Sequence, residues 1–280
     1  MPPDALTSQL DALDEMRKRR FAGLTGRTHG DRSADEPGFV LLHGLTFDHR
    51  MWDPVLAALP TGRAAVAFDL PGHGDSPAID GRGLAPAVEA IREAVLAAGL
   101  DAPIVVGHSI GGPLAAIYAS TYPASGVVSI EAPLRVETFA AGVEQLRPQL
   151  TGDGFDAAWS QFEQSWRMDL VPAPWHGYLH IRRAGAQQLV LQYQADLLER
   201  PLADVLRWRD EGIDRVRHAG IPYLALASNP VDPEERAWLA ARLPQAEVVV
   251  WPVVHHFPHL SDPARFAELL TRFASGVPAE

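Results

Sequence analysis

Ser109 lies in the segment Gly107-His108-Ser109-Ile110-Gly111, with a glycine two positions before it and another two positions after it. This G-x-S-x-G spacing is typical of a serine held on a sharp turn from a strand into a helix, which exposes the hydroxyl at the end of the strand. The next N–H, that of Ile110, then lies at a helix N-terminus, where a developing negative charge is favoured. The pattern predicts a nucleophilic serine.

A serine hydroxyl is activated when a base lies within hydrogen-bond reach and a third group orients that base. The best candidates for the base lie near the C-terminus, in the segment His255-His256-Phe257-Pro258-His259. This segment follows a predicted strand and precedes a predicted helix, so it belongs at the carboxyl edge of a sheet, where ligands bind in open α/β folds. The spacing of His255 and His259 would suit a metal on a helix, but Pro258 disfavours a helix interior, and we predict no metal site.

Bringing these groups to one sheet edge requires parallel strands that alternate with helices. The sequence alternates in this way from residue 39 onward, and its strand segments are continuous apolar runs. Such runs are typical of a parallel sheet that is buried on both faces. The predicted strands span residues 39–42, 64–70, 103–106, 126–132, 223–228 and 248–251. We therefore predict an α/β fold with a doubly wound, mostly parallel sheet.

The alternation stops over residues 134–217, which are mostly helical by pattern and contain four of the seven tryptophans. We predict a helical cap at 134–217, inserted between two parts of a core at 29–133 and 218–280. Aromatic and apolar residues of the cap, and two from the first core segment, are candidates for an apolar substrate-binding wall. Each of them could equally pack the cap onto the core. The candidates are Phe47, Met51, Trp159, Phe162, Trp166 and Trp175.

Residues 1–28 form a separate stretch. Leu6, Leu10, Leu13 and Met16 fall at helical spacing, and basic residues follow at 17–20, as the helix dipole favours. We predict an N-terminal helical extension over 1–28 that packs on the body of the protein. The alternative is a helix that binds a partner or forms a dimer.

The composition limits the classes of function. The chain of 280 residues has a formal net charge of −11, which argues against a nucleic-acid partner, and its lack of cysteine excludes disulfides and thiolate chemistry. We find neither a signal-peptide pattern nor an apolar run of about 18 residues that could span a membrane. We therefore expect a cytoplasmic protein without a membrane span, either a monomer or a homodimer.

Four motifs in a fixed order carry a resemblance to a known family. They are His43-Gly44-Leu45, the D-x-x-G-x-G-x-S run from Asp69 to Ser76, the G-H-S-x-G-G run at 107–112, and H-F-P-H-L-x-x-P at 256–263. Together they resemble the α/β-hydrolase superfamily, in particular its cap-bearing branch of esterases, lactonases and thioesterases. The resemblance covers residues 37–275.

The resemblance implies a role for each motif. Ser109 matches the nucleophile, His256 matches the base, and the N–H groups of Leu45 and Ile110 match the oxyanion hole, with no cofactor. The residue before the catalytic histidine is usually glycine in this family, whereas this chain has His255, which is therefore a second candidate for the base.

The acid departs from the usual family pattern. The family's G-x-x-D-P turn would follow the strand at 223–228, but Pro230 stands where the aspartate is expected. Asp232 could serve if the loop were extended, although before Pro233 it also reads as a helix N-cap. Some members carry the acid directly after the strand that follows the nucleophile helix, and Glu131 has that position here. A carboxylate buried there needs a partner, and an imidazole N–H would satisfy it, so we favour Glu131 over Asp232.

These residues predict a serine hydrolase that cleaves a carboxylic ester, a lactone or a thioester through an acyl-enzyme on Ser109. The expected partner is a small-molecule acyl substrate of apolar character. The alternative is a catalytically slow or inactive protein of the same fold that binds a small molecule or takes part in signalling.

Overall fold

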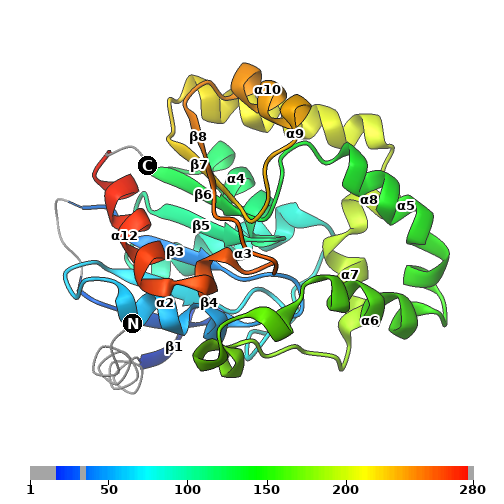
Figure 1. Ribbon diagram of the computed structural model, residues 1–280, viewed down its shortest axis with the longest axis horizontal. Coiled ribbons are helices and arrows are strands. Elements are labelled where there is room, and N and C mark those ends of the chain that lie inside the picture. The colour runs from blue at the N-terminus through cyan, green and yellow to red at the C-terminus, as the bar shows by residue number, and fades with distance from the viewer. Residues whose placement is uncertain (1–16, 32–35, 277–280) are drawn as a thin grey trace.

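The computed structural model describes residues 17–31 and 36–276. In this part of the chain one eight-stranded sheet has the order β1-β2-β4-β3-β5-β6-β7-β8 (Figure 1). The strands are β1 (Arg17–Phe21), β2 (Leu24–His29), β3 (Phe39–Leu42), β4 (Ala65–Phe68), β5 (Ile104–His108), β6 (Gly126–Ile130), β7 (Tyr223–Ala227) and β8 (Ala246–Val250). The strands from β3 onward pair in parallel, which confirms the predicted mostly parallel α/β sheet.

Helices cover this sheet because its central strands are apolar on both faces. Every residue of β3, β4, β5 and β6 is buried, as expected for strands covered on both sides. The helices that alternate with the strands are α2 (Asp53–Ala58), α3 (Leu84–Ala97), α4 (Gly111–Thr121), α10 (Pro233–Arg242), α11 (Pro258–Ser261) and α12 (Pro263–Ala274).

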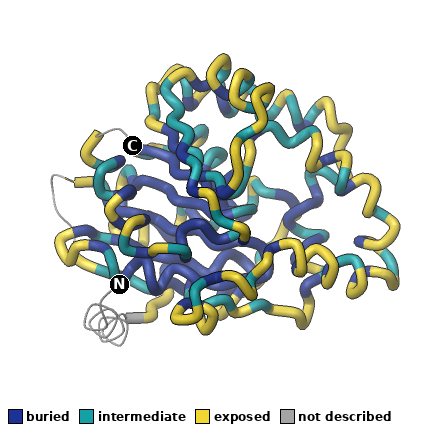
Figure 2. Tube along the Cα trace, viewed as in Figure 1, coloured by how far each residue is buried: buried dark blue, intermediate teal, exposed yellow. Residues whose placement is uncertain are grey.

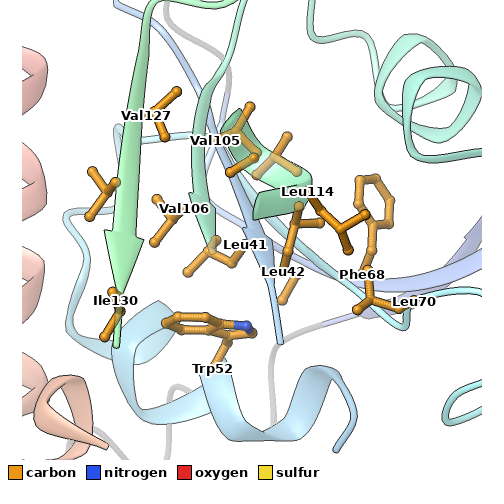
Figure 3. Packing of buried hydrophobic residues seen from close by; sticks show 14 of the residues in the cluster. Leu41, Leu42, Trp52, Phe68, Leu70, Val105, Val106, Leu114, Val127 and Ile130 are labelled. Atoms are coloured by element: carbon orange, nitrogen blue, oxygen red, sulfur yellow. The ribbon is translucent and has the colours of Figure 1, made fainter. Parts of the chain in front are cut away.

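The main core lies between the sheet and these helices. Figure 3 shows Leu41, Val106 and Ile130, from β3, β5 and β6, in one packed layer with the indole of Trp52, which is fully buried. In Figure 2 the central strands are buried along their length, whereas the outer faces of the helices are exposed. Burial of this kind supplies the main stabilisation of the fold, about 1.5–3 kcal/mol for each large apolar side chain.

The predicted N-terminal helix over 1–28 is wrong for the residues that the structure describes. Residues 17–29 form an antiparallel hairpin, in which Phe21 pairs with Leu24 and β2 continues the pairing onto β4. Its two-residue turn has positive φ at both Ala22 and Gly23, the geometry that matches the twist of the flanking strands. Phe21 also packs edge-on against Phe68. The apolar series from Leu6 to Met16 lies outside the described residues.

Between β6 and β7 the described chain contains only helical elements, over the segment predicted as a cap. They are α5 (Glu137–Thr151), α6 (Phe155–Ser165), the short 3-10 helices Met168–Leu170 and Ala173–Tyr178, α7 (Ala186–Tyr193), α8 (Ala195–Glu199) and α9 (Leu202–His218). We call residues 134–217 the helical insertion. Its last helix, α9, packs against α4 and α10, so this part of the insertion lies with the core helices. The division into core and cap stays a prediction. None of the helices in the described chain is long and apolar enough to span a membrane.

Candidate active site

Ser109 lies on the tight turn between β5 and α4. Its φ of 54° is left-handed, a strained conformation for a residue with a side chain. The turn is possible because small residues flank it: a Cβ atom on Gly107 would lie 1.9 Å from the carbonyl oxygen of Gly111, and one on Gly111 would lie 2.4 Å from that of Leu42. The N–H of Ser109 donates to the carbonyl of Ile130 at 2.9 Å, which ties the turn to β6. The side chain is half-buried and lines a cavity.

His256 and Glu131 are brought together from two distant parts of the chain. Nδ1 of His256 lies 3.3 Å from Oε2 of Glu131, within hydrogen-bond distance. The other carboxylate oxygen accepts a hydrogen bond from the N–H of Ser228, at the end of β7. Glu131 follows β6 directly and has a φ of 52°. With the proton on Nδ1, donated to the carboxylate, Nε2 of His256 can accept a proton.

The Glu131 carboxylate is stabilised in its ionised form. Burial alone would raise its pKa, but hydrogen bonds from His256 and from the N–H of Ser228 outweigh burial, and the pKa of Glu131 is lowered. A carboxylate that stays ionised can stabilise positive charge on the neighbouring imidazole.

The backbone of His256 is held from two sides. Its N–H donates to the carbonyl of Trp166, in the helical insertion, at 3.0 Å. Its carbonyl accepts from Nε2 of His108 at 2.7 Å. The pKa of His108 lies well below its usual value because the ring is completely buried, so His108 is neutral. The rings of His256 and Trp166 are stacked, with centroids 6.3 Å apart.

The other two candidates for the site have different partners. Asp232 is exposed, and its Oδ1 accepts hydrogen bonds from the N–H groups of Glu234 and Glu235, so it caps α10. His255 is buried and interacts through its two ring nitrogens with the N–H of Phe257 and the hydroxyl of Ser261. The structure therefore brings Glu131, and not Asp232, to His256.

The loop after β3 reaches the same place. Leu45 lines the cavity together with Ser109 and Ile110. The turn is fixed by His43, whose Nδ1 donates to the carbonyl of Gly44 at 2.7 Å and whose Nε2 accepts from the N–H of Leu70 at 2.9 Å. This arrangement places the residues predicted for the oxyanion hole beside the serine.

One group of side chains among the described residues could hold a metal ion, formed by Asp48, His49 and Asp69. These side chains are already engaged. Asp69 accepts hydrogen bonds from the backbone N–H and from Nδ1 of His49, at 2.8 and 2.7 Å. Asp48 forms an ion pair with Arg50. We interpret Asp69 as a structural residue that holds the loops beside the site in place, because its carboxylate bonds to His49 in one loop and to the N–H of Asp75 in the other.

The cavity beside Ser109 has a volume of about 620 Å³ and is lined mainly by apolar side chains. Of the predicted wall residues, Trp159, Phe162 and Trp166 line it. Phe47, Met51 and Trp175 do not line it and are packed in the hydrophobic core. Much of the lining comes from α4, α5 and α9, which the sequence analysis did not identify. In the sequence, this lining is indicated by the apolar faces of these helices.

Comparisons with known proteins agree with this fold. The model of the alpha/beta hydrolase family matches residues 39–269. A protein of Escherichia coli strain K12, which carries the provisional name carbamate hydrolase RutD, is 29% identical over 247 residues, or 85% of this chain and 91% of that protein.

Solved structures of similar fold have lower sequence identity. The haloalkane dehalogenase DbeA from Bradyrhizobium elkanii has a TM-score of 0.70 at 19% identity, over 94% of this chain and 98% of that one. The enol-lactonase from Burkholderia xenovorans has a TM-score of 0.66 at 19% identity, over 92% of this chain and all (100%) of that one. These likenesses show the fold.

Proposed function

Because the chain belongs to the alpha/beta hydrolase family, we propose that it is a serine hydrolase that cleaves a carboxylic ester, a lactone or a thioester. Ser109 is the nucleophile, His256 the general base and Glu131 the orienting acid. The observation that carries the proposal is the 3.3 Å contact between Nδ1 of His256 and Oε2 of Glu131, close to the strained serine turn.

The proposed reaction has two halves. Oγ of Ser109 attacks the substrate carbonyl carbon while Nε2 of His256 takes the hydroxyl proton, and the N–H groups of Leu45 and Ile110 bind the oxyanion. The tetrahedral intermediate collapses, and His256 returns the proton to the leaving alcohol or thiol. Water then attacks the acyl-enzyme with His256 again as base, which releases the carboxylic acid and restores Ser109.

Glu131 performs the orienting role in this mechanism. Its hydrogen bond keeps the proton of neutral His256 on Nδ1, and its charge stabilises the imidazolium that forms during each half-reaction. Loss of one oxyanion-hole donor raises the activation free energy by about 3 kcal/mol in comparable enzymes. The N–H groups of Leu45 and Ile110 should each lower it by a similar amount.

Two features bear on the type of substrate. The provisional name of the relative points to carbamates, which present the same kind of carbonyl carbon to a serine. The cavity beside Ser109 is lined mainly by apolar side chains, which favours an apolar ester over a small polar carbamate. Carbamates therefore belong in the substrate panel as the competing class.

Reactivity of Ser109 tests the proposal without knowledge of the substrate. We expect a fluorophosphonate to form an adduct at Ser109 within minutes, located by mass spectrometry, and no adduct on Ser109→Ala. A folded wild-type protein that does not react would contradict the proposal. That outcome would favour the alternative, a small-molecule-binding or signalling protein with this fold.

A further inference from the structure

The cavity that contains Ser109 extends along helix α4. Pro113, Ala116, Ile117 and Ser120 line it, and their spacing of three, one and three residues places them on one face of the helix. The 11 residues of α4 rise by about 16 Å. The cavity therefore runs from the serine towards the opposite end of the helix.

Helix α9 forms the other wall of this part of the cavity. Val205, Gly212, Ile213 and Val216 line it, again from one helix face. The helices approach closely where their side chains are small, since a Cβ atom on Gly212 would lie 3.4 Å from Oγ of Ser120. We call the space between these two helix faces the α4–α9 groove. The groove narrows where Gly212 faces Ser120, and a narrowing space suits an unbranched chain better than a ring system.

The charged side chains that line the cavity already have partners. Among the described residues these pairs are Glu131 with His256, Arg135 with Glu234, Asp196 with Arg200, Arg209 with Glu137, and Arg215 with the backbone carbonyl of Ser120. Four of these five side chains pair with an ionisable side chain, whereas Arg215 bonds to a backbone carbonyl. Because burying an ionised group without a partner is costly, an ionised substrate group is disfavoured along the cavity except beside Arg215.

Apolar side chains also form the mouth of the cavity. Phe139, Leu146 and Phe162, from α5 and α6, line the cavity and are nevertheless 43%, 39% and 40% exposed. An apolar substrate that enters here would cover these side chains and remove them from water. The mouth of the cavity is therefore apolar, like its lining.

We propose that the α4–α9 groove binds a neutral, unbranched aliphatic acyl chain, whose carbonyl carbon Ser109 attacks. This inference rests on the serine hydrolase function proposed above. The acyl part is assigned to the groove because it stays attached to Ser109 after the first half-reaction. The leaving alcohol must depart, and water must enter, through the mouth between α5 and α6.

The first experiment is a chain-length series of p-nitrophenyl esters, from acetyl through butanoyl and octanoyl to dodecanoyl, with Ser109→Ala as the blank. Each methylene buried in the groove should raise kcat/KM by about fourfold, until the chain reaches the end of the groove. A series of acetate esters with lengthening alcohols should show a much weaker dependence. A flat acyl series, or a steep alcohol series, would overturn the proposal.

Two variants narrow the cavity at different places. Ala116→Phe fills the groove on α4, and Ala158→Leu fills the cavity from α6, where Ala158 is half-buried on the lining face. Both should reduce kcat/KM for dodecanoyl esters by at least about tenfold more than they reduce kcat/KM for the acetyl ester. The matched controls, Thr121→Phe and Ala157→Leu, change exposed residues of the same helices that do not line the cavity. These controls should behave as wild type towards every chain length.

The outcomes distinguish the hydrolase function from the assignment of the α4–α9 groove. Absence of fluorophosphonate labelling at Ser109 would contradict the hydrolase function itself. Normal labelling with an unchanged length profile in Ala116→Phe, at wild-type melting temperature, would contradict the α4–α9 groove alone. A carbamate that is cleaved faster than every ester would also overturn the acyl-chain assignment while keeping the nucleophile.

Discussion

Nε2 of His108, the residue directly before the serine, lies 2.7 Å from the backbone carbonyl oxygen of His256 and donates a hydrogen bond to it. The side chain of His108 thus connects the turn of Ser109 to the loop of the base. Its ring is completely buried and neutral. Burial holds the pKa of this ring well below its usual value, which favours the neutral form with its proton on Nε2.

We expect His108→Leu to lower kcat by about tenfold to a hundredfold, because the base loop loses a buried hydrogen bond that fixes its position. His108→Gln keeps an N–H donor at a similar reach and should restore most of the activity. Steady-state kinetics of both variants measure kcat, and thermal unfolding shows whether each variant is folded. Equal kcat in both variants would show that the hydrogen bond does not position the base.

Glu131→Gln should reduce kcat by about a thousandfold or more, because the amide can no longer stabilise the imidazolium of His256. Asp232→Asn should leave kcat unchanged, since Asp232 caps α10 at an exposed position. Fluorophosphonate labelling rates provide the measurement when the substrate is unknown. A larger effect of Asp232→Asn than of Glu131→Gln would reverse the assignment of the acid.

Replacing Gly111 or Gly142 with alanine should change the stability of the protein in opposite directions. At Gly111 a Cβ atom would lie 2.4 Å from the carbonyl oxygen of Leu42, whereas at Gly142, inside α5, it would meet nothing within 4 Å. Gly111→Ala should destabilise the protein by at least about 3 kcal/mol, and Gly142→Ala should stabilise it by about 0.5–1 kcal/mol. Urea unfolding of the purified variants measures both. A neutral Gly111→Ala would contradict the tight packing of the serine turn.

Asp53 gives the fold a dependence on pH that is separate from the site. Burial raises the pKa of Asp53 to about 7, although Arg27 opposes the shift. The folded protein holds this proton more tightly than the unfolded chain does. The resulting contribution to the free energy of unfolding is complete below the ordinary aspartate pKa of 3.8 and is lost as the pH rises to about 7. Asp53→Asn should therefore gain stability relative to wild type between about pH 5 and pH 8, by at most about 3 kcal/mol. Denaturant unfolding at the two pH values tests this, and a difference that is independent of pH would contradict it.

The parallel sheet could be predicted because its strands are short apolar runs, a signal that depends only on neighbouring residues. The hairpin of β1 and β2 was missed for a related reason. Arg19 and Arg20 are exposed on an edge strand, and this charged run looked like the end of a helix. The two-residue turn at Ala22 and Gly23 was the missed signal.

The candidate site could be predicted in part. The argument that a carboxylate buried after β6 needs an imidazole partner pointed to Glu131, and His256 is that partner. The catalytic roles of both residues stay predictions. The lining of the cavity could not be predicted, because α4, α5 and α9 meet through packing between segments far apart in the chain. Phe47 and Met51 were chosen for their closeness in sequence to Leu45, but they point into the core.

The hydrogen bond from the N–H of His256 to the carbonyl of Trp166 joins the proposed base to the helical insertion. Trp166 also forms part of the cavity wall and stacks on the His256 ring. An outward movement of the Trp166 backbone would therefore break this hydrogen bond or move the His256 loop with it. We expect the position of the helical insertion and that of the proposed base to be coupled, so a ligand that displaces the insertion should lower the reactivity of Ser109 without contacting it.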